Sequence, residues 1–237
     1  MSEDGQNKSQ FSPPPARAVD LLDALSSGEL TAVSLMQKTY DRIAQENPRI
    51  NAICTLVPLE QSLEAAQRVD DARKAGQTLP QLAGLPLAIK DLADTQGILT
   101  TQGSPIHARQ IPDVDSLFVS RLKDAGGIII GKTNTPEFGA GSHTFNPLFG
   151  VTRNPFDPQK TAGGSSGGAA AALASGMVAL ADGSDMGGSL RNPAAFCNIV
   201  GLRPSMGRIP TIPKTQETFS RMAVEGPMAR TVEDCAM

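Results

Sequence analysis

The segment that most constrains the fold is residues 163–168, in which four glycines surround Ser165 and Ser166. Glycine has no Cβ, so such a run lets the backbone approach other parts of the chain closely or adopt conformations that other residues resist. A flexible linker is the plainer interpretation. However, an alanine-rich helical pattern at residues 168–175 and an apolar strand pattern at 177–181 follow at once. The sequence therefore predicts a packed loop–helix–strand unit whose two hydroxyl groups point inward.

Charge and cysteine content exclude several classes of function. The 237 residues carry a net charge of −3, which provides no basic face for nucleic acid. Aromatic residues make up only 4% of the chain, so we expect a core of Ala, Leu, Ile and Val. The three cysteines have no paired spacing, and they indicate neither a disulfide framework nor a zinc site.

The two ends of the chain differ from its interior. Residues 1–15 are polar and proline-rich without the apolar core of a signal peptide, and they are predicted to form a flexible tail. The most apolar stretch, residues 167–181, is too short to span a bilayer, so we expect a cytoplasmic protein without membrane contact. At Thr231 the pattern of a helix N-terminus begins only a few residues before the chain stops, which predicts a truncated domain over residues 16–237.

Apolar periodicity predicts helices that alternate with short buried strands. The expected helices cover residues 16–46 in two segments with Thr31 as a cap between them, 63–75, 116–124, 168–175 and 192–198. The expected strands cover residues 85–89, 126–130 and 177–181. This alternation is typical of an α/β fold, in which loops at the strand ends carry the chemistry.

Residues 126–133 match the phosphate-binding pattern GxxxxGK[ST], with Lys132 as the lysine. In a true phosphate loop the intervening residues wrap the anion and a helix begins at the lysine. Here the intervening residues are themselves the predicted strand, and Pro136 follows where the helix should run. Nucleotide binding through Lys132 therefore stays a minor hypothesis.

Two further patterns are weaker than they look. Ser165 and Ser166 each match GxSxG, but that motif needs a histidine downstream, and His107 and His143 both lie upstream. We expect both histidines to lie in loops or make local hydrogen bonds. Ser120 and Lys123 match SxxK on an ordinary amphipathic helix, where the lysine is expected to be solvated.

An amide hydrolase without histidine needs another base. A lysine serves if burial lowers its pKa by about 3 units, and Lys90 follows an apolar strand at its carboxyl end. A surface lysine that caps the strand is the alternative. Further on, Gly187 and Gly188 precede Ser189, so successive backbone N–H groups could converge on one point as in a nucleophile loop. A plain glycine turn before a helix explains the same residues.

Taken together, these stretches resemble the amidase signature family. The resemblance extends from about Ala16 to the end of the chain, and its motifs are residues 51–52, 84–91, 131–134, 152–155, 163–168, 185–191, 201–204 and 226–228. It implies a mixed central β-sheet covered by α-helices on both faces. Family members are longer, so it also implies that the C-terminal half of the domain is absent.

The resemblance implies a Ser–cis-Ser–Lys triad. Ser189 would be the nucleophile, Ser165 the bridging serine after a cis peptide bond from Gly164, and Lys90 the neutral base. The backbone N–H groups of Met186, Gly187, Gly188 and Ser189 would form the oxyanion hole.

Other residues of these motifs would support the triad. Ser166 would add a hydrogen bond, and Asp185 and Arg191 would form a structural pair that holds the nucleophile loop. No cofactor or metal is implied, the partner would be a small-molecule amide, and a homodimer is left open.

Within the family two kinds of enzyme remain. Glutaminase subunits of tRNA-dependent amidotransferases carry a Ser-Ser-Leu-Asp-Gln stretch that residues 219–225 do not reproduce. The sequence therefore favours a general amidase of small or aryl carboxamides over such a glutaminase. The third hypothesis is a catalytically inactive fragment with an interaction or regulatory role.

Overall fold

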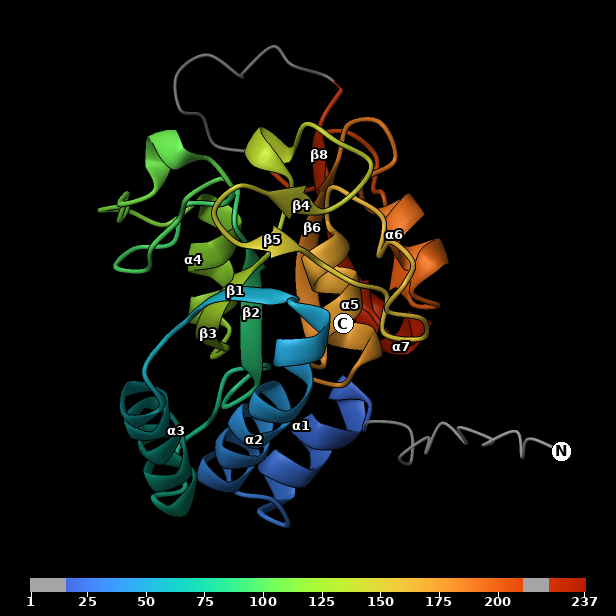
Figure 1. Ribbon diagram of the computed structural model, residues 1–237. Helices are drawn as coiled ribbons and strands as arrows, with labels where there is room; N and C mark the ends of the chain where they lie inside the picture. Colours follow the sequence, from blue (N-terminus) through green and yellow to red (C-terminus); the bar gives the residue numbers. More distant parts are fainter. Residues whose placement is uncertain (1–15, 211–221) are drawn as a thin grey trace, which may run out of the picture.

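The computed structural model describes residues 16–210 and 222–237, so the predicted tail lies outside the described residues (Figure 1). A six-stranded sheet has the order β1-β3-β2-β6-β8-β7, and β4 and β5 form a separate pair. The main strands are β1 (Ile53–Leu56), β2 (Pro86–Lys90), β3 (Ile128–Thr133), β6 (Leu180–Asp185), β7 (Val200–Gly201) and β8 (Val224–Ala229). The small pair consists of β4 (Phe145–Asn146) and β5 (Gly150–Val151).

Helices surround this sheet. They are α1 (Ala18–Ser27), α2 (Ala32–Ile50), α3 (Leu59–Lys74), α4 (Leu117–Asp124), α5 (Gly167–Ala174), α6 (Arg191–Phe196) and α7 (Val232–Ala236). Two short 3-10 helices are η1 (Pro105–His107) and η2 (Glu137–Gly139). In Figure 1, α1, α2 and α3 gather at one end of the molecule, and α5 lies against the middle of the sheet.

The sheet is mixed, as the resemblance implied. β2 pairs in parallel with β3 and β6, whereas β1 with β3, β6 with β8 and β7 with β8 are antiparallel. All five residues of β2 are buried. Because successive side chains of a strand point to opposite faces, β2 is covered on both faces, which confirms the predicted α/β architecture.

Local sequence signals explain how α2 is placed. The Thr31 side chain accepts a hydrogen bond from the Ser34 amide at 3.1 Å, which confirms the predicted cap. Asp70 of α3 accepts hydrogen bonds from the amides of Ala32 and Val33, so α3 caps the same helix end from outside. The helix ends at Asn51, which adopts a left-handed conformation with φ of 58°.

Helix α5 is apolar on every side and is buried from Gly167 to Leu173. Small residues allow this helix to pack closely against neighbouring backbone. A Cβ on Gly168, for example, would lie 2.3 Å from the Asn134 amide nitrogen. This close packing places the start of α5, and with it Ser165 and Ser166, in the interior beside the carboxyl end of β2.

Three sequence predictions need correction. The strand predicted at residues 177–181 lies at Leu180–Asp185, and its polar residues are mostly buried by neighbouring strands. Asn192, predicted to cap a helix, lies inside α6, which begins at Arg191. The strands β1, β4, β5, β7 and β8 were not predicted.

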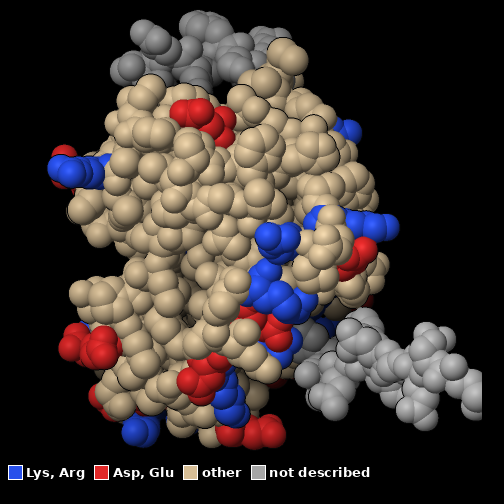
Figure 2. All heavy atoms as spheres, in the orientation of Figure 1, with Lys and Arg blue, Asp and Glu red and all other residues tan. Residues whose placement is uncertain are grey.

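Charged side chains are unevenly distributed over the face drawn in Figure 2. On that face, lysine, arginine and acidic side chains lie close to one another over the lower helices, whereas the upper part is largely uncharged. The uncharged part of this view coincides with the region of β4 and β5 in Figure 1.

Candidate active site

Lys90, the last residue of β2, ends among three serine hydroxyl groups. Its side chain is buried, and Nζ lies 2.7 Å from Oγ of Ser165 and 2.8 Å from Oγ of Ser166. A third hydroxyl, Oγ of Ser184 on β6, lies 2.9 Å away. The predicted contact between Lys90 and Ser165 is therefore present, and the structure adds Ser184 to it.

Three hydroxyl groups contact the Lys90 amine, and this number restricts which of them can donate a hydrogen bond to it. A charged ammonium group donates three hydrogen bonds, whereas a neutral amine donates two and accepts one. The Ser166 hydroxyl donates to the carbonyl oxygen of Ser184 at 3.3 Å, so its proton is already engaged. In the neutral form of Lys90, the accepted hydrogen bond therefore comes from Ser165 or Ser184.

Burial lowers the pKa of Lys90 to about 8, although the carboxylates of Glu225, Asp182 and Asp185 oppose the shift. This is the direction that a lysine base requires. Asp182 on β6 also accepts a hydrogen bond from the Lys90 backbone amide at 2.7 Å. That bond fixes the end of β2 from which the side chain starts.

The serine cluster is held by close backbone packing. The peptide bond between Gly164 and Ser165 is cis, as the resemblance implied. Thr144 donates from Oγ1 to the carbonyl of Gly163 at 2.9 Å and accepts from the Gly167 amide at 3.1 Å. A Cβ on Gly164 would lie 2.8 Å from the backbone nitrogen of His143, so only glycine fits there without displacement.

The loop that carries Ser189 is organised around Asp185, whose side chain is fully buried. Its carboxylate accepts hydrogen bonds from the amides of Gly188 and Leu190 and from Arg191 Nε at 2.9 Å. Arg203 donates to the same carboxylate at 2.9 Å and to the Asp185 carbonyl. Although burial opposes ionisation, Arg191 and the two amides hold the pKa of Asp185 well below its usual range.

Ser189 follows on this loop and is half-buried. Its carbonyl oxygen accepts a hydrogen bond from the Ser166 amide at 3.3 Å, which joins the two serine segments through the backbone. Within the described residues, the structure has no hydrogen bond between the hydroxyls of Ser165 and Ser189. The Gly188 amide, expected to face an oxyanion, donates to Asp185 at 2.8 Å instead.

Met186 and Gly187 lie on the exposed side of the same loop. Met186 is 58% exposed, and Gly187 has open space where a side chain would be. In the described part of the chain, no acceptor binds the amides of Met186, Gly187 or Ser189. These three N–H groups are therefore the ones left to meet a ligand in this arrangement.

The Amidase family model matches residues 34–237 of this chain. The chain belongs to the amidase signature family.

Curated relatives match most of the chain. A glutamyl-tRNA(Gln) amidotransferase subunit from Rhodopirellula baltica is 47% identical over 220 residues, which are 93% of this chain and 44% of that protein. The corresponding subunit from Desulfatibacillum aliphaticivorans is 44% identical over 215 residues, 91% of this chain and 44% of its own. The chain thus spans less than half the length of these curated relatives.

Solved structures agree with this fold. A bacterial aryl acylamidase of the amidase signature family superposes with a TM-score of 0.88 at 35% identity, over 95% of this chain and 47% of that one. A 6-aminohexanoate cyclic dimer hydrolase superposes with a TM-score of 0.85 at 33% identity, over 93% of this chain and 45% of that one.

Sequence reasoning missed three polar residues of this site: Asp182, Ser184 and Arg203. Asp182 and Ser184 were overlooked because the strand was predicted to end at residue 181, before either of them. Extending it to Asp185 would have placed both on one face by the alternation of side chains. Arg203 lay in a motif of the resemblance, but nothing in its spacing pointed to Asp185.

The motifs set aside by the sequence analysis lie elsewhere. Lys132 is buried in β3, which extends to Thr133 beyond the predicted end at residue 130, and no helix of the described chain begins there. His107 ends η1, and His143 contacts Thr161 Oγ1 at 3.0 Å. Lys123 pairs with Asp115 at 2.8 Å, whereas solvation was predicted.

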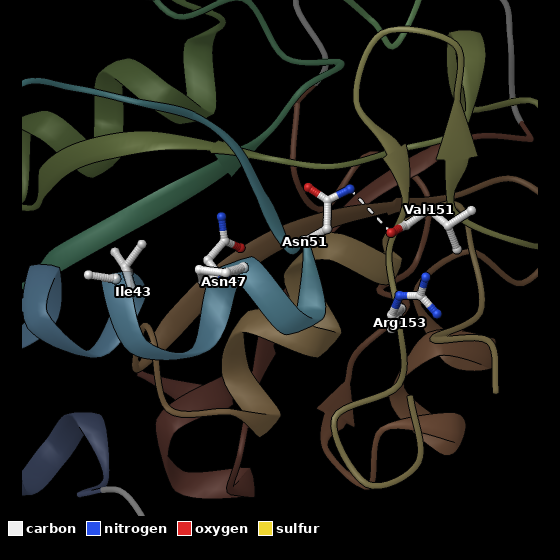
Figure 3. A pocket seen from close by; sticks show the side chains of 7 residues that line it. Ile43, Asn47, Asn51, Val151 and Arg153 are labelled. Carbon is white, nitrogen blue, oxygen red and sulfur yellow. Dashed lines mark hydrogen bonds between the residues drawn. The ribbon is translucent and has the colours of Figure 1, made fainter. Parts of the chain in front are cut away.

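A separate open pocket of about 560 Å³ lies between the end of α2 and β5 (Figure 3). Its lining comprises Ile43, Ala44, Asn47, Pro48, Asn51, Val151 and Arg153. Asn51 donates to the Val151 carbonyl at 3.2 Å, which ties α2 to the small strand pair. None of the predicted site residues lines this pocket.

Metal and membrane features are lacking in the described regions. Residues 16–210 and 222–237 contain no group of three His, Cys, Asp or Glu side chains that could hold a metal ion. Over the same ranges, no helix combines the length and apolar character needed to cross a bilayer.

Proposed function

We propose that this chain carries the catalytic apparatus of a serine amide hydrolase, with Ser189 as nucleophile, Ser165 as bridging serine and Lys90 as base. The observation that carries the proposal is the 2.7 Å contact between Lys90 Nζ and Ser165 Oγ in a buried site. Burial that favours the neutral amine supplies the base that a chain with two peripheral histidines otherwise lacks.

The reaction proceeds in two stages. Ser189 Oγ attacks the amide carbonyl while its proton passes to Ser165, whose own proton passes to Lys90. The amides of Met186, Gly187 and Ser189 donate to the developing oxyanion. The C–N bond then breaks, the protonated cluster returns a proton to the leaving nitrogen, and ammonia or an amine departs. Water hydrolyses the acyl-enzyme by the same proton path and releases the carboxylic acid.

Ser165 must move or rotate to reach Ser189, because the two hydroxyls are not hydrogen-bonded in the described structure. Such contacts commonly tighten only when substrate is bound. Ser166 and the pair of Asp185 with Arg191 keep the two segments in place around this step.

A glutaminase subunit is the second candidate, because the curated relatives named above are amidotransferase subunits at 44% and 47% identity. Against it stands the sequence of residues 219–225, part of which lies outside the described residues. We favour a small-molecule carboxamide as substrate. A panel of amides that includes glutamine, simple aliphatic amides and anilides distinguishes the two by which one is hydrolysed.

The decisive experiment is intact-mass analysis after treatment with a fluorophosphonate, which forms an Oγ–P bond with an activated serine and expels fluoride. We expect one adduct on the parent, none on Ser189→Ala, and a slower reaction of Lys90→Ala. Ser120→Ala, a half-buried serine on α4, is the matched control and should react like the parent. A folded parent that forms no adduct would establish the inactive-fragment hypothesis.

A further inference from the structure

Lys132 is a fully buried lysine that the proposed mechanism does not use. It lies on β3 directly opposite Ile89 in the parallel pairing with β2, one position before the pair of Lys90 with Thr133. Because side chains alternate between faces, the two lysines project from opposite faces of the sheet. Lys132 Nζ donates to the Ala93 carbonyl at 2.5 Å and to Thr95 Oγ1 at 2.8 Å.

These hydrogen bonds reach the segment that leaves β2 directly after Lys90. The Ala93 amide donates back to the Lys90 carbonyl at 3.0 Å, so the carbonyl held by Lys132 belongs to the turn that Lys90 begins. Thr95 Oγ1 also donates to the Ala93 carbonyl at 3.2 Å. Lys132 and Thr95 therefore converge on one backbone oxygen, three residues from the proposed base.

The same segment borders the bridging serine on its other side. A Cβ on Gly139 would lie 2.6 Å from Leu92 Cδ1 and 3.6 Å from Ser165 Oγ, so Leu92 and Ser165 lie near the same position. A displacement of residues 91–93 would therefore reach both Lys90 and the surroundings of Ser165.

Packing alone does not explain why a lysine, rather than an apolar residue, occupies position 132. Burial lowers the pKa of Lys132 to about 8 against the carboxylates of Asp91, Asp182 and Asp94 and the Cys54 thiol, which face it from the neighbouring elements. A methionine would occupy similar volume without placing a polar nitrogen in the interior. Compared with a methionine, Lys132 adds two hydrogen bonds to the segment that follows Lys90.

We infer that Lys132 is a positioning residue: it holds residues 91–95 so that Lys90 stays within hydrogen-bond distance of Ser165. The inference rests on the proposed function of Lys90 and Ser165. It assigns a role in this chain to a lysine that the sequence pattern suggested only for phosphate binding.

The test uses the rate of fluorophosphonate reaction at Ser189 in folded variants. Lys132→Met should lower this rate about tenfold to hundredfold, because displacements of about 1 Å at a reacting group have effects of that size. Thr95→Val, which keeps the shape and loses the hydroxyl, should lower it in the same direction. Thr95→Ser, which keeps the hydroxyl and loses a methyl group, should react nearly like the parent.

If Thr95 had only a packing role, Thr95→Ser would react more slowly than Thr95→Val. That result would overturn the inference even if Lys132→Met fails to fold. A folded Lys132→Met that reacts at the parent rate would also overturn it while leaving the proposed function intact. If the parent does not react, the proposed function fails, and amide hydrogen exchange decides instead. The Asp91 and Ala93 amides must then exchange faster in Lys132→Met than in the parent, and unchanged exchange refutes the positioning role.

Discussion

The two serine segments of this molecule are built in opposite ways. Ser165 and Ser166 are buried, where the Lys90 amine and backbone groups contact them and no room remains for a side chain at Gly164. The loop of Ser189 has an exposed rim at Met186 and is held by charge, through a buried carboxylate between two arginines.

This difference separates two tasks. A lysine works as a base near neutrality only where burial disfavours its charged form, so the segment that meets Lys90 has to be buried. A nucleophile has to meet substrate, so its loop has to open to the surface and needs strong hydrogen bonds to stay ordered there. Four predictions test whether the two segments really divide the work in this way.

The largest effect is expected on removal of the base. Lys90→Met should lower the fluorophosphonate reaction rate by about 10²–10⁴-fold, the usual range for loss of general base catalysis. Mass analysis of samples quenched at successive times measures the rate. Lys38→Met, on α2, is the matched control and should leave the rate unchanged. A Lys90→Met protein that reacts as fast as the parent would remove the distinction between the two segments.

Removing the charge that holds the nucleophile loop comes next. Asp185→Asn should reduce the free energy of unfolding by about 3 kcal/mol, because it leaves Arg191 and Arg203 without their carboxylate. Urea denaturation measures the change. The comparison is Asp157→Asn, whose exposed pair with Lys160 spans 4.0 Å and should matter by less than about 0.5 kcal/mol. Equal effects of the two substitutions would contradict a charge-held loop.

The third prediction compares how tightly the two serine segments are packed. One added methyl group should reduce the free energy of unfolding in the segment of Ser165 but not in the loop of Ser189. Gly164→Ala brings a Cβ within 2.8 Å of the His143 backbone, and we expect a loss of about 1–3 kcal/mol in unfolding free energy. Gly187→Ala meets no atom within 4 Å and should change it by less than about 0.5 kcal/mol. Thermal and urea unfolding of both variants measure the difference, and similar losses would show that the nucleophile loop is packed as tightly as the serine cluster.

The last prediction concerns the pH dependence. In the proposed mechanism the neutral form of Lys90 is the base. Because burial lowers its pKa to about 8, the reaction rate should fall about tenfold for each pH unit below that value. Asp185 stays ionised throughout, since its pKa lies below the usual range, so the nucleophile loop adds no titration there. Reaction rates from about pH 6 to about pH 10 test this, and a profile unchanged by Lys90→Met would assign the titration to another group.

The residues that could be predicted are those whose local pattern carries their chemistry. Lys90 ends an apolar run, glycines flank Ser165, and Asp185 precedes two glycines that open the nucleophile loop. The Lys90–Ser165 contact and the Asp185–Arg191 pair are confirmed by geometry. The roles of Ser189 and of the oxyanion donors remain predictions.

The features that could not be predicted from the sequence depend on contacts between segments that are distant along the chain. Pro227 cannot donate to a strand ladder, so β8 gave little strand signal, yet its register places that proline opposite Asp182. Asp182 and Ser184 resembled a polar loop because only tertiary packing buries or half-buries them. Arg203 meets Asp185 across 18 residues of chain, a distance over which no periodicity operates.

Strand β6 carries a consequence for how such a site can change. From one six-residue strand, Asp182 fixes the backbone of Lys90, Ser184 contacts its amine, and Asp185 anchors the loop of Ser189. A single inserted or deleted residue before Asp182 would turn the side chains of Asp182 and Ser184 to the opposite face and separate both from Lys90 at once, whereas Asp185 would keep the contacts within its own loop. The spacing along this strand therefore constrains Asp182 and Ser184 together: a substitution changes one contact of Lys90, whereas a change in length removes both in one step.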